Sequence, residues 1–160
     1  MTGSQAITLA AGCSLEALEE GVNHEFVAFD GREPEGLPRA PGEAARTGEG
    51  GWLLHFAPRR WLLAGDCGAV ATQLAAATAE GTLVEVEGKW RAFGLRGAAA
   101  TRLLASALEM ESLLTGRDCA MTSFVDCPLL VVRATGSLRL WTHASYVEDL
   151  IERLRNLRVG

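Results

Sequence analysis

The sequence predicts an α+β fold in which helices cover antiparallel sheets. Two observations support this class. Pairs of short apolar runs are joined by a tight turn, and each pair is followed by a helical pattern. The arrangement occurs at residues 52–79 and again at 129–157. Its repetition predicts that the chain is a duplication.

The first hairpin and its helix are predicted from turn and capping residues. Apolar runs at 52–57 and 60–64 are separated by a Pro-Arg pair, which is typical of a hairpin. Asp66 is expected to cap a helix that ends before Gly81. The alternating segment 82–88 then predicts a strand.

The second hairpin has the same organisation near the end of the sequence. Strands are expected at 129–133 and 138–142, followed by a helix at about 146–157. Ser145 and Glu148 have the spacing of a capping box. The apolar residues at helical spacing are Val147, Leu150, Ile151, Leu154 and Leu157.

The beginnings of the two halves also correspond. A short strand is expected to pass through Gly12 in the first half, and through Gly97 in the second, into a helix. Leu15 and Leu18 would face inward from the first of these helices. Each half then follows approximately the order strand, helix, two or three strands and helix, which is the ferredoxin-like scheme.

The chain is therefore predicted to be a single domain made of two pseudo-repeats, at about residues 5–88 and 89–157. A Gly/Pro-rich segment at 31–51 holds three of the five prolines. Proline removes hydrogen-bond donors and glycine raises the entropy cost of ordering, so neither strand nor helix is expected there. The segment is predicted to be a flexible loop or a docking element.

Charge and hydropathy argue against two classes of partner. The net charge is −5 and the basic residues are scattered, which does not predict binding to nucleic acid or to an anionic membrane. The first twenty residues lack the basic start and apolar core of a signal peptide, and no apolar run approaches the roughly 18 residues of a membrane span. A cytoplasmic protein with reduced cysteines is expected.

The cysteine spacing does not predict a metal or redox site. Cys13, Cys67, Cys119 and Cys127 include no Cys-x-x-Cys pair, and they lack the paired ligands of structural zinc. They are expected to be buried packing residues, with no metal bound. A continuous strand over 119–127 would place Cys119 and Cys127 on the same face.

Several segments of packing residues carry a resemblance to a known family. They lie at 56–65, 93–108, 116–124 and 128–146. The sequence resembles the gamma subunit of heterotetrameric sarcosine oxidase. That family is similar in fold to the folate-binding core of the glycine cleavage aminomethyltransferase, which also consists of ferredoxin-like halves.

The resemblance implies an accessory role in a larger complex. The family's complex oxidises sarcosine, an N-methyl amino acid, and passes the one-carbon unit to tetrahydrofolate with release of hydrogen peroxide. FAD, FMN, NAD and tetrahydrofolate are expected in the larger flavoprotein and folate-binding partner subunits. No cofactor and no catalytic residue is expected in this chain.

Certain residues are expected to contact these partners, because aromatic side chains commonly anchor interfaces. They are the strand tryptophans Trp52, Trp61, Trp90 and Trp141, and the charged residues Arg117 and Asp118. His55 alternates with Leu54 and Phe56, which predicts an outward or partner-facing ring.

Two alternatives of other classes remain open. One is a free-standing folate-binding protein of the aminomethyltransferase kind, although the chain is short for the domains that enclose folate. The other is a small-molecule-binding regulatory domain, which the duplicated scheme permits by fold analogy.

Overall fold

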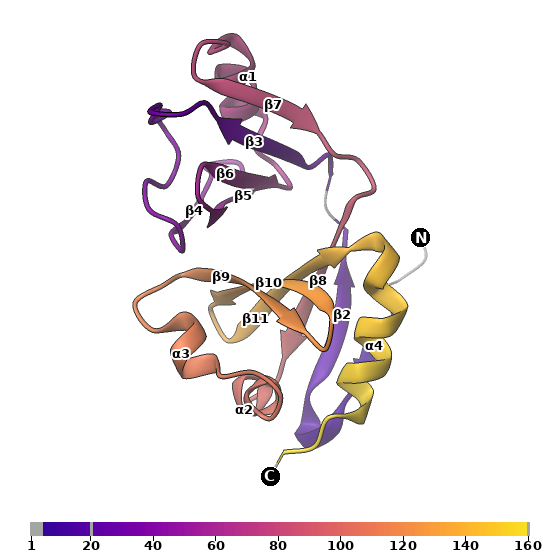
Figure 1. Ribbon diagram of the computed structural model, residues 1–160. Helices are drawn as coiled ribbons and strands as arrows, with labels where there is room; N and C mark the ends of the chain where they lie inside the picture. The colour runs from indigo at the N-terminus through magenta and orange to yellow at the C-terminus, as the bar shows by residue number, and fades with distance from the viewer. Residues whose placement is uncertain (1–4, 20, 160) are drawn as a thin grey trace. The chain divides into compact units, whose positions relative to one another are not determined.

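The computed structural model describes residues 5–19 and 21–159 and divides the chain into two compact units (Figure 1). Unit 1 combines the chain up to Glu19 with the chain from Lys89 onward, and unit 2 ends at Gly88. Each unit is an antiparallel sheet with helices packed on it. The predicted α+β class is therefore confirmed.

Unit 1 contains a six-stranded sheet in the order β1-β2-β8-β11-β10-β9. Its strands are β1 (Ile7–Thr8), β2 (Ser14–Leu18), β8 (Trp90–Arg96), β9 (Cys119–Phe124), β10 (Cys127–Ala134) and β11 (Ser137–His143). Its helices are α2 (Ala100–Ala105), α3 (Met110–Leu114) and α4 (Val147–Asn156), with 3-10 turns η1 (Ala10–Gly12) and η2 (Ala144–Tyr146).

Helix α4 packs on this sheet through its predicted apolar stripe. Leu150 and Leu154 are fully buried in a core that also contains Leu103 of α2 and Phe93 of β8. The capping-box prediction is wrong at the start of the helix. Residue Tyr146 is the N-cap and makes no side-chain capping bond, because the 3-10 turn η2 precedes the helix there.

The segment that contains two of the cysteines is a hairpin and not one strand. Val125 and Asp126 have φ values of 46° and 68°, which form the tight turn between β9 and β10. Cys119 therefore pairs with Val132, whereas Cys127 lies at the turn, opposite Phe124. Because the hairpin reverses the chain, the two thiols lie at opposite ends of the strand pair.

Unit 2 contains a five-stranded sheet in the order β4-β5-β6-β3-β7. Its elements are β3 (His24–Ala28), β4 (Ala44–Arg46), β5 (Trp52–Ala57), β6 (Arg60–Ala64), α1 (Gly68–Ala76) and β7 (Gly81–Glu85). Phe26, Leu53, Trp61 and Leu63 of the sheet form a core with Leu74 of α1. The hairpin predicted at 52–64 is confirmed as β5 and β6.

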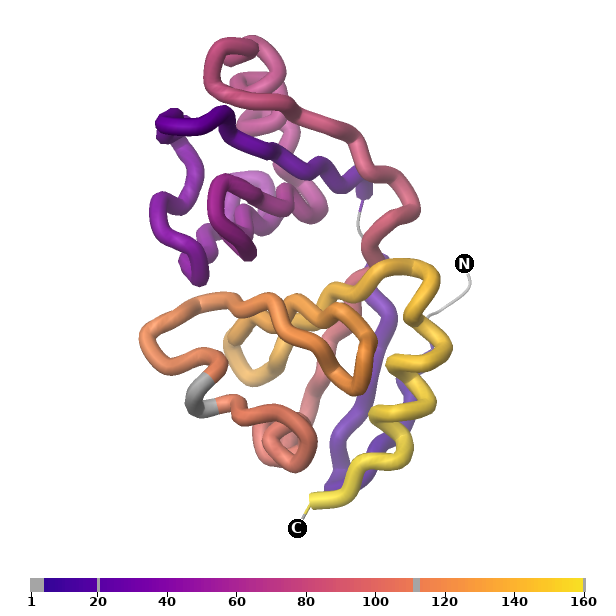
Figure 2. Tube along the Cα trace, viewed as in Figure 1, coloured from indigo at the N-terminus to yellow at the C-terminus, as the bar shows by residue number. Residues whose placement is uncertain are grey.

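The two units share one strand order. The neighbouring strands β7-β3-β6-β5 of unit 2 correspond to β2-β8-β11-β10 of unit 1. Helix α1 follows β6 as α4 follows β11. The strand after α1 is β7, but its counterpart in unit 1 is β2, from the N-terminal segment that is indigo in Figure 2. Both units thus follow a ferredoxin-like arrangement.

The role of β2 corrects two expectations. Residues 14–18 were expected to be helical, but they form a strand in which Leu15 is buried opposite Leu95 of β8. Pairing with β8 outweighs the local helical preference of this segment. The first pseudo-repeat was expected to begin near residue 5, but the residues up to Glu19 belong with the second half of the chain.

The Gly/Pro-rich segment 31–51 contains a strand, contrary to expectation. Strand β4 pairs with β5, Ala44 lying opposite Leu54 and Arg46 opposite Trp52. In unit 1 the corresponding connection between β8 and β10 holds the helices α2 and α3, whereas in unit 2 the described residues 29–51 form no helix. The prolines are confined to positions outside β4.

Helix α1 is capped differently from the sequence prediction. Its N-cap is Cys67 and not Asp66, and Cys67 makes no side-chain capping bond. Instead, the Glu49 carboxylate accepts a hydrogen bond from the Ala69 backbone N–H at 3.1 Å. A carboxylate from a distant loop thus satisfies one of the free N–H groups at the helix start.

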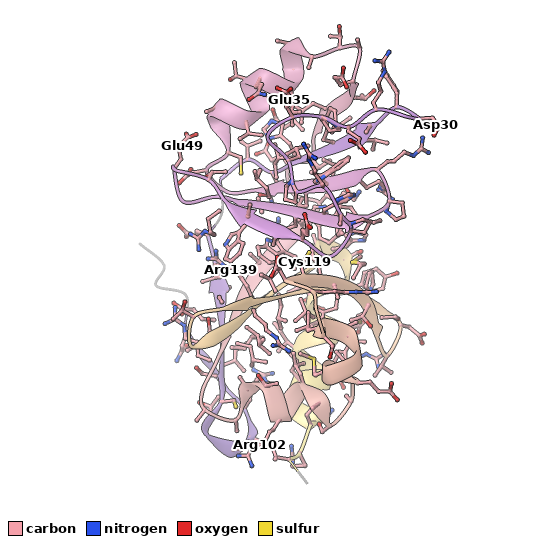
Figure 3. All side chains as sticks on the ribbon, turned by 90° about the vertical axis from the view of Figure 1, so that its left-hand side faces the viewer. Asp30, Glu35, Glu49, Arg102, Cys119 and Arg139 are labelled. Atoms are coloured by element: carbon pink, nitrogen blue, oxygen red, sulfur yellow. The ribbon has the colours of Figure 1, made fainter. Side chains whose placement is uncertain are left out.

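The described part of the chain has no helix that is both long and apolar enough to cross a membrane. Charged side chains such as Asp30, Glu49 and Arg102 extend from the periphery of the unit to which each belongs (Figure 3).

Gly81 provides a test of the packing in unit 2. A Cβ atom at this position would overlap the Val27 carbonyl and approach the Phe26 ring to 2.6 Å. Gly81→Ala is therefore expected to lower the free energy of unfolding by about 1–3 kcal/mol. Denaturant titration followed by circular dichroism measures this change. Gly48→Ala, where no atom lies within 4 Å of the new Cβ, is the matched control, and equal stability of the two variants would contradict the packing.

Candidate functional site

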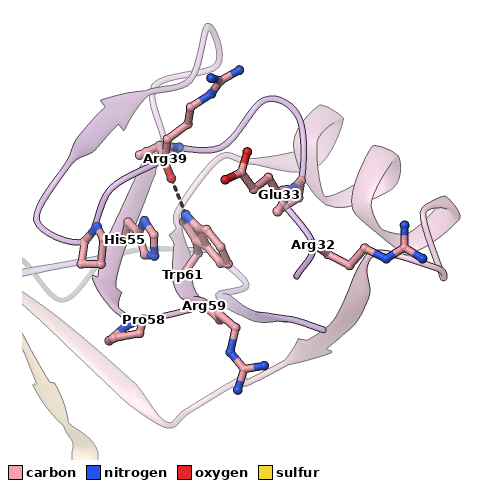
Figure 4. Close-up of a pocket in the computed structure, with 10 residues that line it drawn as sticks. Arg32, Glu33, Arg39, His55, Pro58, Arg59 and Trp61 are labelled. Atoms are coloured by element: carbon pink, nitrogen blue, oxygen red, sulfur yellow. Dashed lines mark hydrogen bonds between the residues drawn. The ribbon is translucent and has the colours of Figure 1, made fainter. Parts of the chain in front are cut away.

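A cavity of about 240 Å3 in unit 2 is the candidate functional site (Figure 4). It lies between residues 29–43, here called the proline loop, and the β5–β6 hairpin. The residues that line it are Arg32, Glu33, Pro34, Pro38, Arg39, Pro41, His55, Pro58, Arg59 and Trp61. All of them belong to unit 2, so the cavity is formed within one compact unit.

The proline loop is held to the sheet by hydrogen bonds and by one buried side chain. The Trp61 Nε1–H donates to the Pro38 carbonyl at 2.8 Å, as the dashed line in Figure 4 shows. The Gly42 N–H donates to the His55 carbonyl at 2.8 Å, and the His55 N–H donates to the Glu43 carbonyl at 3.1 Å. Leu37 is buried in the core of the unit. These contacts fix the wall of the cavity.

Two stacked rings form one side of the cavity. His55 and Trp61 are cross-strand partners, and their ring centroids lie 4.1 Å apart with an interplanar angle of 24°. His55 is only 3% exposed, so the predicted outward orientation is wrong. The hairpin is buried on both of its faces, which carry Leu53, Leu54 and Leu62. Alternation of apolar and polar residues along the strand therefore could not show on which face His55 lies.

The surroundings of His55 determine its charge. Burial lowers the pKa of the imidazole below its ordinary value near 6.5, and this effect outweighs the opposing influence of the Pro38 carbonyl and the Glu43 carboxylate. His55 is therefore neutral at pH 7. It can act as a hydrogen-bonding group in the cavity without adding positive charge.

Charged side chains surround the cavity opening. Arg32, Arg39 and Arg59, here called the arginine rim, extend outward in Figure 4, whereas the Glu33 carboxylate points toward the space above Trp61. The net charge of the whole chain is −5, so three arginines around one cavity are a local reversal of sign. The cavity is thus bordered by one exposed carboxylate and three arginines.

The tryptophans expected to contact partners are all buried. The exposed fractions are 7% for Trp52, 4% for Trp61, 3% for Trp90 and 0% for Trp141. Trp61 belongs to the core of unit 2 and to the cavity. The expectation that these rings form a surface for partners is corrected, since large aromatic residues on strands pack within this chain first.

Arg117 and Asp118 lie in the exposed turn that leads into β9. The Asp118 carbonyl accepts a hydrogen bond from the Arg133 N–H at 3.4 Å, which attaches this turn to β10. Both side chains are accessible, and their contact with a partner stays a prediction. The structure places them in unit 1, separate from the cavity-lining set in unit 2.

The cysteines are buried free thiols, as the sequence predicts. Burial raises the pKa of the Cys119 thiol to about 12, with a smaller contribution from the Asp118 charge. A thiol with this pKa stays protonated at neutral pH and is a poor nucleophile or metal ligand. Among residues 5–19 and 21–159, no group of three His, Cys, Asp or Glu side chains could hold a metal ion.

The fold defines the chain as an α+β protein with two ferredoxin-like units. A scan against protein-family models and a search of the curated proteins found no match. Among solved structures, the chain is similar to a chain of the heterotetrameric sarcosine oxidase from Corynebacterium sp. U-96, determined in complex with pyrrole 2-carboxylate. The TM-score is 0.73 at 23% sequence identity, and the match covers 94% of this chain and 86% of that chain.

The fold predicted from the resemblance is therefore confirmed by this comparison.

The cavity was not predicted as a site. Its signal in the sequence is the concentration of prolines and arginines at residues 32–41, next to a hairpin that contains His55 and Trp61. Residues distant in the sequence form one wall because the Trp61 indole, the backbone bonds to His55 and the buried Leu37 hold the proline loop against the hairpin.

The depressed pKa of His55 predicts a pH dependence of stability. Because the unfolded chain binds a proton at His55 more readily, the free energy of unfolding should fall as the pH drops through about 6.5. Denaturant titrations across this range should show a steeper loss in the wild type than in His55→Gln. Identical pH slopes for the two proteins would show that the imidazole is not desolvated.

The raised pKa of Cys119 predicts a thiol that resists alkylation. In the folded protein at about pH 8, iodoacetamide should leave Cys119 unmodified, because the thiolate is scarce and the side chain is buried. Unfolding in guanidinium should make it reactive. Peptide mapping by mass spectrometry measures both states, and rapid alkylation of the native protein is the contrary result.

Proposed function

We propose that this chain is a small accessory subunit of a sarcosine oxidase-type hetero-oligomer. The observation that carries the proposal is the extent of the structural similarity, which covers 94% of this chain and 86% of the chain from the Corynebacterium complex. A match over nearly the whole of both chains favours a counterpart of that chain. A shared domain within otherwise different proteins would match only in part.

In this proposal the chemistry belongs to the partners. Larger flavoprotein and folate-binding subunits would hold FAD, FMN, NAD and tetrahydrofolate, and would oxidise an N-methyl amino acid and transfer its one-carbon unit. This chain would support their assembly. The buried, protonated Cys119 and the buried neutral His55 are consistent with a chain that supplies no nucleophile.

The proposed contact surface includes the exposed turn of Arg117 and Asp118. An exposed charged turn anchored to a sheet can pair with complementary charges on a larger subunit and influence the rate of association. The four tryptophans are buried within the chain and do not contribute to this surface.

A second candidate is a small-molecule-binding protein, and the cavity beside His55 and Trp61 favours it. Concave sites with apolar walls and a few polar groups are typical of ligand pockets. The two candidates are compatible, because an accessory subunit can also bind a ligand.

Co-expression with the genes that neighbour its own tests the subunit proposal. The chain should co-purify at fixed stoichiometry with a flavoprotein, and sarcosine should be oxidised by the assembly and not by the isolated chain. Arg117→Gln should lower the recovery of the complex more than the exposed control Arg102→Gln. Turnover of sarcosine by the isolated chain, or failure to associate with any neighbour, would refute the proposal.

A further inference from the structure

We propose that the open edge of the unit 2 sheet, at β7, binds an extended segment of another protein, which joins the sheet as a further strand. This segment runs antiparallel to β7 and is apolar on one face and basic on the other. The inference goes beyond the accessory role, because it names an interaction surface and the chemistry of its occupant. The surface shares no residue with the turn at Arg117 or with the cavity.

Strand β7 is the last strand of its sheet, and no strand of the described chain pairs with its outer side (Figure 1). It has five residues, whereas the edge strands β1 and β4 have two and three. Proteins commonly protect an open edge with a short strand, with proline or with several charges. β7 contains no proline and one charged residue, Glu85. This edge is therefore long enough to accept another strand.

The hydrogen bonds on the inner side of β7 determine which backbone groups face the open edge. The Val86 N–H donates to the Asn23 carbonyl at 2.9 Å, and the Phe29 N–H donates to the Glu80 carbonyl at 2.9 Å. In an antiparallel ladder, residues that bond to the neighbouring strand alternate with residues whose N–H and C=O point away. By the register of β7 with β3, the even-numbered residues of β7 bond inward and the odd-numbered ones face outward.

The outward backbone groups belong to Gly81, Leu83 and Glu85. Each of these residues offers one N–H donor and one C=O acceptor to an added strand. Main-chain hydrogen bonds of this kind give affinity to a segment of any sequence, and the side chains beside the edge then give specificity.

Exposed apolar side chains lie beside this edge on one face of the sheet. Val84 of β7 is 48% exposed, and its diagonal neighbour Val27 on β3 is 40% exposed. Phe29, two residues further along the chain, is 47% exposed. These side chains point away from α1, because the alternate residues Phe26 and Leu83 pack in the core with that helix. Neighbouring exposed apolar groups are typical of an interaction surface.

The charge along β7 specifies a basic occupant. Residues 80–87 include Glu80, Glu85 and Glu87 but no lysine or arginine. Arg32 lies 4.0 Å from Glu80, whereas Glu85 and Glu87 are exposed. Within β7, Glu85 projects from the face opposite to the exposed valine. A strand with alternating apolar and basic residues would therefore place its apolar side chains beside the valines and its basic side chains beside Glu85.

A second copy of this chain is a poorer occupant of the edge. Pairing of β7 with β7 of another copy would bring two segments of three glutamates each together, and like charges on adjacent strands destabilise pairing. The charge of β7 thus opposes self-association and favours a different protein with a basic strand.

Titration of the purified full chain with fluorescein-labelled peptides tests the proposal by fluorescence anisotropy. The basic probe is Thr-Val-Lys-Val-Lys-Val-Thr, the acidic probe has glutamate in place of both lysines, and the broken probe has proline in place of the central valine. The basic probe should bind saturably and at least about tenfold more tightly than the acidic probe, because attraction across the strands becomes repulsion. The broken probe should lose at least about tenfold, because proline disrupts the ladder. No saturable binding of the basic probe, or equal binding of either other probe, would overturn the proposal.

Variants of the chain locate the binding edge. Glu85→Lys should abolish the preference for the basic probe, whereas Glu152→Lys, the same charge change on the exposed surface of α4, should retain it. Val84→Thr should weaken the basic probe about fourfold, roughly the effect of one methyl group. Val22→Thr, an exposed position outside β3 and β7, is its control and should have no effect.

Two further results would contradict the proposal. If Glu85→Lys keeps the preference for the basic probe, the peptide does not lie along β7. Sedimentation velocity of the chain without peptide tests the other occupant, and a dimer that Val84→Thr weakens would assign the edge to a second copy. A monomer is the expected result.

Discussion

The antiparallel pairing of β2 with β8 is the constraint on which the rest of the structure depends. It brings Ser14–Leu18 beside Trp90–Arg96. In unit 2 the corresponding strand, β7, follows the helix α1, but no strand follows α4 in unit 1, so β2 takes that place. Because β2 and β8 are neighbours, the chain from Gly21 to Gly88 leaves and re-enters unit 1 on adjacent strands. Unit 2 can therefore fold as an inserted, self-contained sheet with its own core.

The cavity in unit 2 exists because a loop takes the place that two helices occupy in unit 1. Unit 1 places the short helices α2 and α3 between β8 and β10, whereas unit 2 has the proline loop and β4 in the equivalent connection. Proline cannot continue a helix, so this segment covers the hairpin as an irregular wall held by the Trp61 indole and by Leu37. The space beneath such a wall is the cavity, and its charged rim comes from the same segment and the adjacent hairpin turn.

These features separate the packing residues of the chain from the polar groups around the cavity. The thiols are buried and the metal-binding residue types are dispersed through the described chain, whereas the cavity in unit 2 brings several polar and charged side chains together. The cavity and the turn at Arg117 lie in different units, so the two proposed roles use different residues.

The sequence by itself determined the local elements whose signals are short-range. The β5–β6 and β10–β11 hairpins and the apolar stripe of α4 follow from periodicity and turn residues. Only the tertiary structure decided that residues 14–18 form a strand, because their partner β8 lies more than seventy residues away. It likewise decided the inward position of His55, since both faces of the hairpin are apolar and only the covering loop distinguishes them. Long-range pairing and coverage are properties of the folded chain, and no local pattern encodes them.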